Sequence, residues 1–203
     1  MPSSKNFVPL TTDSLTTICL SNLSCGMNKL LTRRLIAFSI DYILILFYAG
    51  ILFLSSLLLQ YLSAKQISAP GPVKGQLIGF FLLTLPVFLY FLLSEKSKKK
   101  GTIGKRISNI LVKTVDDKPT ATQQLFVRNF LKFLPWEIAH TGVHWVLFYS
   151  RNNEQTPLWV YILLIVPQLA IVFYIITIIR SKGNGSFYDK IAGTKISLKI
   201  NSI

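Results

Sequence analysis

The sequence has few charged residues, fewer acidic ones, and almost no cysteine or histidine. Only 15% of its 203 residues are charged and 51% are hydrophobic, a composition outside that of ordinary soluble domains. Two cysteines, Cys19 and Cys25, have no second pair and no nearby histidine, so they do not form a zinc motif. We interpret them as unpaired thiols on a reducing side. The composition indicates one small integral membrane domain.

The excess of lysine and arginine gives a formal net charge of +14, which on a soluble chain would suggest nucleic acid as the partner. The basic residues lie beside apolar runs, however, and the sequence holds no base-reading or base-stacking motif. Basic residues that flank apolar runs are typical of membrane proteins. We therefore expect the lipid bilayer, and no nucleic acid, as the partner of this chain.

Four apolar runs predict membrane-spanning helices. In the first, the eighteen residues 42–59 contain no ionisable group other than two tyrosines. A helix that rises about 1.5 Å per residue needs roughly 20 such residues to cross the hydrocarbon core of a bilayer. Pro86 predicts a kink in the second run, where neighbouring helices or side chains would satisfy the carbonyl that the proline frees. The predicted spans are residues 33–60, 77–94, 129–149 and 158–180.

Two short runs outside the spans predict β-strands. Residues 107–115 are rich in β-branched side chains, and residues 194–200 alternate apolar and polar side chains. An isolated exposed strand leaves its amides unpaired, so we expect the two runs to pair with each other. The predicted fold class is an all-α membrane protein, a four-helix transmembrane bundle with a small cytoplasmic two-stranded β element.

The chain divides into a tail and one domain. Residues 1–28 are polar and without a strong period, which predicts a flexible tail with a short interfacial helix around residues 15–27. Residues 29–200 form the transmembrane domain, and residues 95–128 form its basic cytoplasmic loop. With four crossings, both termini and this loop lie on one side, which holds nineteen of the 22 lysines and arginines. The positive-inside bias therefore predicts cytoplasmic termini.

Arg34 and Asp41 stand at the entry to the first span. Seven residues are nearly two helical turns, so the two side chains share one face of a helix, about 10 Å apart along its axis. That separation is too large for a tight ion pair. A carboxylate at a membrane boundary is costly unless it is partnered, so each residue needs a further partner from elsewhere in the chain.

Three separated motifs complete a pattern: Arg34-x-x-Ala37-x-x-x-Asp41, Gly101-Thr102-x-Gly104-Lys105, and Tyr188-Asp189-x-x-Ala192-Gly193-Thr194. Their order and their spacing around the spans resemble the RDD family of bacterial membrane proteins, from about residue 29 to residue 199. The family's characteristic Arg, Asp and Asp carry over to Arg34, Asp41 and Asp189. The family often has His and Gly where this chain has Tyr188 and Asn109.

The resemblance implies a multi-pass protein of the bacterial inner membrane and a role in transport, although no common reaction defines the family. For Arg34, Asp41, Lys105 and Asp189 two interpretations stay open. They form either a charge cluster that binds an ion or an anionic solute, or an internal ion-pair lock that holds the loop and tail against the first helix. Both interpretations place the four residues together.

A second group of polar residues interrupts the third span. Glu137, His140 and His144 fall on one face of a helix, within an arc of about 100°. Such a face serves as a proton relay, or as a polar surface packed against Gln168 and backbone carbonyls inside the bundle. A metal site ranks last, because bundle metal sites take ligands from several helices and only one helix here supplies them.

Three function classes follow. A transporter of ions, H+ or Na+, or of small solutes leads, supported by intramembrane charge and proline-interrupted helices. A non-transporting assembly or accessory protein is the alternative, and a membrane-embedded metal enzyme, resting on Glu137, His140 and His144, is the minor one. We expect no enzyme activity, no cofactor and no bound metal. Since four helices leave little room for a private pathway, we also expect a homo-oligomer or a membrane partner protein.

Overall fold

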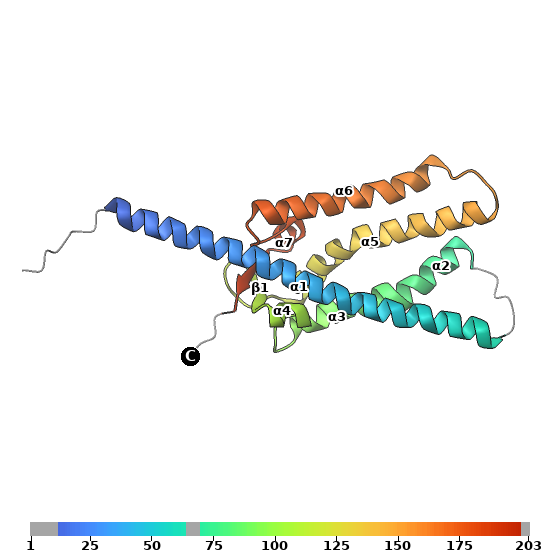
Figure 1. Cartoon of the computed structure of the whole chain (residues 1–203), viewed down its shortest axis with the longest axis horizontal. Helices are drawn as coiled ribbons and strands as arrows, with labels where there is room; N and C mark the ends of the chain where they lie inside the picture. The colour runs from blue at the N-terminus through green and yellow to red at the C-terminus, as the bar shows by residue number, and fades with distance from the viewer. Residues whose placement is uncertain (1–11, 64–69, 200–203) are drawn as a thin grey trace, which may run out of the picture.

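The computed structural model describes residues 12–63 and 70–199, with side chains from Lys29 onward. Its elements follow in the order α1 (Thr12–Ser63), α2 (Pro72–Gly79), η1 (Phe80–Thr84), α3 (Leu85–Lys96), α4 (Ile103–Ile107), β1 (Ile110–Thr114), α5 (Thr122–Arg151), α6 (Leu158–Arg180), α7 (Phe187–Ile191) and β2 (Thr194–Leu198). The long helices run along the molecule, and the short elements α4, β1 and α7 gather near one end of the bundle (Figure 1).

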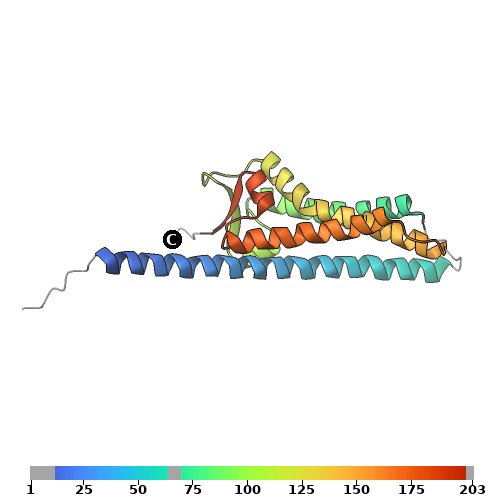
Figure 2. The same cartoon turned by 90° about the horizontal axis from the view of Figure 1, so that it is seen from above.

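Helix α1 runs without a break for 52 residues, well beyond the length that a bilayer requires. It forms a layer alongside the other helices, and its first turns extend past them (Figure 2). Residues 12–28, which the sequence predicted as a tail with a separate short helix, are instead the first part of α1, because no proline separates them from the first span. Residues 1–11 and the two cysteine side chains lie outside the described part of the chain.

The second predicted span is one continuous helical segment made of α2, η1 and α3, in which η1 is a π-helical turn. Pro86 has no backbone N–H, so the carbonyl of Leu82, four residues earlier, loses its helical partner. Tyr48 of α1 donates its hydroxyl to this carbonyl at 2.7 Å. A neighbouring helix thus satisfies the freed carbonyl, as the sequence predicted.

Helices α5 and α6 pack against each other. In this pair too, a tyrosine of one helix donates to the carbonyl that a proline frees in the other. Pro135 lies inside α5, and the carbonyl four residues before it belongs to Leu131. Tyr174 of α6 donates its hydroxyl to Leu131 O at 3.1 Å. Gly142 lets the two helices approach closely, because a Cβ atom there would lie 2.8 Å from Leu164 Cδ2.

Strands β1 and β2 pair antiparallel, with Val112 opposite Ile196. This confirms the predicted pairing, with strands shorter than the runs 107–115 and 194–200. Both of these side chains are buried, together with Ile110 of β1 and Leu125 of α5, in a small apolar core that also contacts α1. The sheet therefore ties the segments after α3 and after α7 to the start of the first span.

Within the described residues, three helical segments are long and apolar enough to cross a membrane: Lys29–Ser63, Pro72–Lys96 and Leu158–Arg180. Their large apolar side chains are mostly exposed; Phe47 and Leu169 are 71% and 64% exposed. Exposed apolar surface on this scale is stable in lipid and not in water. Helix α5, which contains the predicted third span, is not among these three segments.

Candidate functional site

Arg34 reaches from α1 to the C-terminal part of the chain. Its Nη2 atom donates to Asp189 Oδ2 at 2.8 Å and to the Tyr188 hydroxyl at 3.1 Å. Its Nη1 atom donates to Gly183 O at 3.1 Å. Gly183 has a φ of +88°, and a Cβ atom there would lie 2.8 Å from the backbone nitrogen of Leu31, so this approach requires glycine.

Asp189 is fully buried and is shared between two arginines. In addition to the bond from Arg34, it accepts a hydrogen bond of 2.6 Å from Arg128 Nε to its Oδ1 atom. The backbone N–H of Ser186 donates to Oδ2 at 2.8 Å, which caps the first turn of α7. The carboxylate therefore joins α1, α5 and α7.

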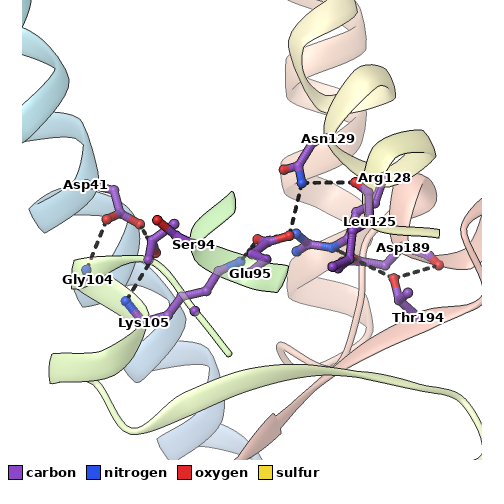
Figure 3. Close-up of polar contacts among 12 residues, drawn as sticks. Asp41, Ser94, Glu95, Gly104, Lys105, Leu125, Arg128, Asn129, Asp189 and Thr194 are labelled. Carbon is purple, nitrogen blue, oxygen red and sulfur yellow. Dashed lines mark hydrogen bonds and ion pairs between the residues drawn. The ribbon is translucent and has the colours of Figure 1, made fainter. Parts of the chain in front are cut away.

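Glu95, at the end of α3, is the second buried carboxylate in contact with Arg128. Arg128 Nη1 donates to Glu95 Oε1 at 2.7 Å, and Asn129 Nδ2 donates to Oε2 at 3.0 Å. Lys105 of α4 also donates to Oε1, so Glu95 lies between cations from two elements (Figure 3). We call this chain of contacts the ionic clasp: Arg34, Asp189, Arg128, Glu95 and Lys105.

The ionic clasp connects α1, α3, α4, α5 and α7, and its side chains are buried or nearly so. A buried ion pair adds little net stability over a well-packed apolar pair. Removing one partner, however, leaves an uncompensated buried charge, at a cost of about 3 to 5 kcal/mol. The clasp therefore specifies how the loop and the C-terminal segment dock on the bundle.

Neighbouring charges and burial shift the pKa values of Asp189 and Lys105, two clasp residues outside the spans. Burial alone would raise the pKa of Asp189, but Arg128 and Arg34 hold that pKa below its usual range. The Asp189 carboxylate is therefore ionised at neutral pH. Burial lowers the pKa of the Lys105 ammonium, and Arg128 lowers it further, against the opposing effect of Glu95.

Asp41 is also buried, with 3% of its surface exposed, but it lies outside the clasp. It accepts hydrogen bonds from Thr102 Oγ1 at 2.6 Å, from the backbone N–H of Gly104 at 3.0 Å and from the Tyr90 hydroxyl at 3.2 Å. All three donors are neutral. The carboxylate receives the N-terminal turn of α4 and holds it against α1.

Gly104 is the point of closest approach between α4 and α1. A Cβ atom built on it would overlap the carbonyl oxygen of Ala37 and would lie 3.0 Å from Asp41 Cγ. Only glycine permits this contact, because the obstructing atoms include backbone. Ala37, one turn before Asp41, is small for the same reason and is buried. These two small residues allow Asp41 to reach the backbone of α4.

The structure brings the four predicted charge-cluster residues to one end of the bundle but divides them into two sets. Arg34 and Asp189 form a direct ion pair, and Lys105 joins them through Glu95 and Arg128. Asp41 contacts the α4 turn instead. The expectation that Arg34 and Asp41 need separate partners agrees with these contacts.

Sequence reasoning missed Glu95, Arg128 and Asn129. The available signal was the scarcity of acidic residues: the chain has eight, against 22 lysines and arginines. Glu95 ends an apolar span immediately before a run of lysines, and an acidic residue in that position needs a partner. That Arg128 is this partner depends on how α3 and α5 pack, which no local pattern reports.

A separate polar site lies between α5 and the second span. Glu137 Oε2 accepts a hydrogen bond of 2.6 Å from Gln76 Nε2, and its Oε1 accepts one from the Thr84 hydroxyl. Gln76 belongs to α2 and Thr84 is the last residue of the π-turn η1. The polar face of α5 is therefore directed toward the second span. The interpretation that packed this face against Gln168 of α6 is wrong.

The other members of the predicted polar face take different surroundings. His140 lies against Trp136 with ring centroids 4.5 Å apart, and His144 lies beside Gly75 of α2. Gln168, which was expected to pack against this face, is exposed on α6. Among the described residues no group of three or more His, Cys, Asp or Glu side chains is arranged to hold a metal ion.

Helices of membrane-spanning length, exposed apolar faces and buried polar clusters define an integral membrane protein. The model of the RDD family matches residues 29–193, which is most of the chain and includes Arg34, Asp41 and Asp189. The protein therefore belongs to the RDD family. No match is found among curated proteins or among solved structures.

The two departures from the family pattern keep the local geometry. Asn109 has a φ of +53°, in the left-handed region where glycine is the default residue and asparagine is the next best suited. Tyr188 accepts a hydrogen bond from Arg34, and an imidazole nitrogen of histidine can accept in the same way.

Proposed function

We propose that this RDD-family membrane protein is a transporter that moves ions, H+ or Na+, or small solutes across the bacterial inner membrane. The observation that carries the proposal is Glu137. Its carboxylate lies about halfway along α5 and accepts hydrogen bonds only from the neutral groups of Gln76 and Thr84 within the described chain. An ionisable group at that depth is costly, and its usual reason in membrane proteins is an ion or substrate pathway.

The same helices have the interruptions that transport proteins use. The second span contains the π-turn η1, which ends two residues before Pro86, and α5 contains Pro135. π-turns inside helices occur frequently at functional sites, and broken spans expose backbone groups where substrates bind. Thr84 belongs to η1, so the interruption of the second span and the carboxylate of α5 meet at one place.

The proposal includes four spans, with residues 129–149 of α5 as the third, and cytoplasmic termini. This arrangement leaves Lys65, Lys74 and Arg151 as the only basic residues on the outer side. A membrane-impermeant thiol reagent, applied to intact cells after Cys19 and Cys25 are replaced by serine, tests it. A cysteine introduced at Asn152 should react and one at Ser181 should not. Reaction at Ser181 would show that the number or the orientation of the crossings is wrong.

Flux into proteoliposomes tests transport itself. The wild-type protein should move H+, Na+ or a small solute faster than empty liposomes do, and Glu137→Gln should abolish this flux while remaining folded. Glu154→Gln is the matched control, since it makes the same chemical change at an exposed residue just after α5. Asp41→Asn should lower the stability of the protein more than its flux per folded molecule, because Asp41 holds α4 against α1.

A non-transporting assembly or accessory protein is the second candidate, and the ionic clasp supports it. All five clasp charges are paired with one another, which suits a fixed scaffold better than a site that must take up and release an ion. Helix α1 also exposes apolar side chains between Leu35 and Leu62, a surface available to a second copy or a partner. If wild type moves no tested ion or solute, this candidate takes the lead. Neither candidate assigns the protein an enzymatic activity.

A further inference from the structure

We propose that Glu137, Thr84 and Gln76 form a binding site for a single monovalent cation, at which Na+ and H+ compete. The role of this site in the protein rests on the proposed transport function, whereas the evidence for the site itself is the geometry of the three side chains. The three side chains come from α5, η1 and α2. Gln76 and Thr84 donate hydrogen bonds to the two carboxylate oxygens of Glu137.

The contrast between the half-buried Glu137 and the fully buried carboxylates indicates a ligand. Asp189 and Glu95 are each neutralised by two cationic side chains, and Asp41 accepts the N-terminal turn of α4. Glu137 has neither kind of compensation within the described chain. A carboxylate among apolar helices without a counter-charge is stabilised when it takes up a proton or a cation.

Gln76 supplies the second observation. Its Nε2 donates to Glu137, while its Oε1 atom is buried and has no hydrogen-bond partner. An unsatisfied buried oxygen costs free energy, and turning the amide over would direct it at the carboxylate. In that orientation Gln76 Oε1 accepts the proton of a neutral Glu137 or coordinates a cation. The two amide orientations therefore match the empty and the occupied site.

Charge and ligand type select the cation. The occupied site offers oxygens of a carboxylate, a hydroxyl and an amide with a total charge of one negative unit. A monovalent cation or a proton brings this charge to zero, whereas a divalent ion would leave a positive charge between apolar helices. Oxygen ligands suit hard cations, so transition metals are disfavoured.

Four charged or titratable side chains lie near the site, and none of them contacts the Glu137 carboxylate within the described structure. His140 and His144 lie on its own helix, with Arg151 at the end of that helix. On α2 the charged neighbour is Lys74, which is exposed. None of these four side chains makes a hydrogen bond or ion pair to the Glu137 carboxylate in the described structure. His144 instead fills the space beside Gly75.

Proton release from the purified full-length protein in weakly buffered detergent tests the proposal without any flux. Addition of NaCl should displace a proton from wild type, measured with a pH indicator, and choline chloride at equal concentration should not. Glu137→Gln should release none, while Glu154→Gln, the exposed matched control, should behave as wild type. Gln76→Leu should need about tenfold more NaCl, the effect of one lost contact to a charged group.

Proton release from Glu137→Gln equal to that of wild type would overturn the proposal. So would a wild-type protein that neither releases a proton nor changes its melting temperature with NaCl relative to choline chloride. If Glu137→Gln does not fold, Gln76→Leu provides the test. A higher NaCl concentration for proton release than in wild type supports the site, and an unchanged concentration contradicts it. Sodium-linked proton release without flux in liposomes would support the cation site and contradict the transport function. Unchanged flux in Glu137→Gln would support the transport function and contradict the cation site.

Discussion

Arg128 and Asp189 are joined by a hydrogen bond of 2.6 Å from Nε to Oδ1, although 61 residues separate them in the chain. The same guanidinium donates through Nη1 to Glu95 Oε1 at 2.7 Å. Arg128 is therefore the central member of the ionic clasp and the one that contacts both of its acids. The planar fork of arginine, with donors pointing in fixed directions, suits this double contact, which lysine could not reproduce.

Removal of the Arg128 guanidinium should destabilise the protein more than removal of any exposed arginine. Arg128→Ala leaves two buried carboxylates short of a partner, at a cost of about 3 to 5 kcal/mol. For a chain of this size each kcal/mol lowers the melting temperature by roughly 2 to 4 °C. Arg151→Ala, at the exposed far end of α5, is the control and should melt within a degree or so of wild type. Equal melting of the two variants would show that the clasp does not hold the fold.

Two glycine-to-alanine changes should have opposite effects on stability. Gly104→Ala forces a methyl group against the Ala37 carbonyl and should cost about 1 to 3 kcal/mol or more. Gly50→Ala lies inside α1 with no atom within 4 Å of the new methyl group, so it should gain up to about 1 kcal/mol from helix propensity. Thermal unfolding of both proteins in the same detergent measures the difference. A neutral Gly104→Ala would mean that α4 does not pack on α1 as described.

The stability effects of Tyr48 and Pro86 should be coupled, because Tyr48 donates to the carbonyl that Pro86 leaves without a helical partner. Tyr48→Phe removes the donor to Leu82 O and should cost about 1 kcal/mol. Tyr61→Phe, an 84% exposed tyrosine of the same helix, should be neutral. In a Pro86→Ala background the helix regains its own N–H donor, so Tyr48→Phe should cost less there than in wild type. A double-mutant cycle on melting temperatures gives the coupling, and strict additivity would contradict it.

The depressed pKa of Asp189 makes a prediction about acid stability. The pKa of an aspartate in an unfolded chain is about 3.9. In the folded protein, Arg128 and Arg34 hold the pKa of Asp189 below this range. The stabilisation is therefore fully present above the unfolded value and is lost as the pH falls through the folded one. Wild type should lose stability on acidification from pH 5 to pH 3 more steeply than Asp189→Asn, measured as melting temperature against pH. Parallel curves for the two proteins would show that the carboxylate is not shifted.

Local sequence patterns determined the parts of this protein that depend on composition and period. The apolar run 158–180 coincides with α6, because a continuous apolar segment of that length has few alternatives to a membrane helix. The pairing of β1 with β2 was also predictable, since exposed strand amides require a partner and the described chain offers two such runs. The seven-residue spacing of Arg34 and Asp41 already excluded a tight pair between them.

Only the tertiary structure decided which groups meet. Arg34 and Asp189 are 155 residues apart, and their contact depends on the way the sheet and Gly183 dock the C-terminal segment on α1. The polar face of α5 was visible in the sequence, but its orientation toward Gln76 and Thr84 follows from helix packing. Periodicity reports which side of a helix is polar, because it reflects the turn of that helix alone. The neighbour that this side contacts is set by the packing of all the helices together, which no local pattern contains.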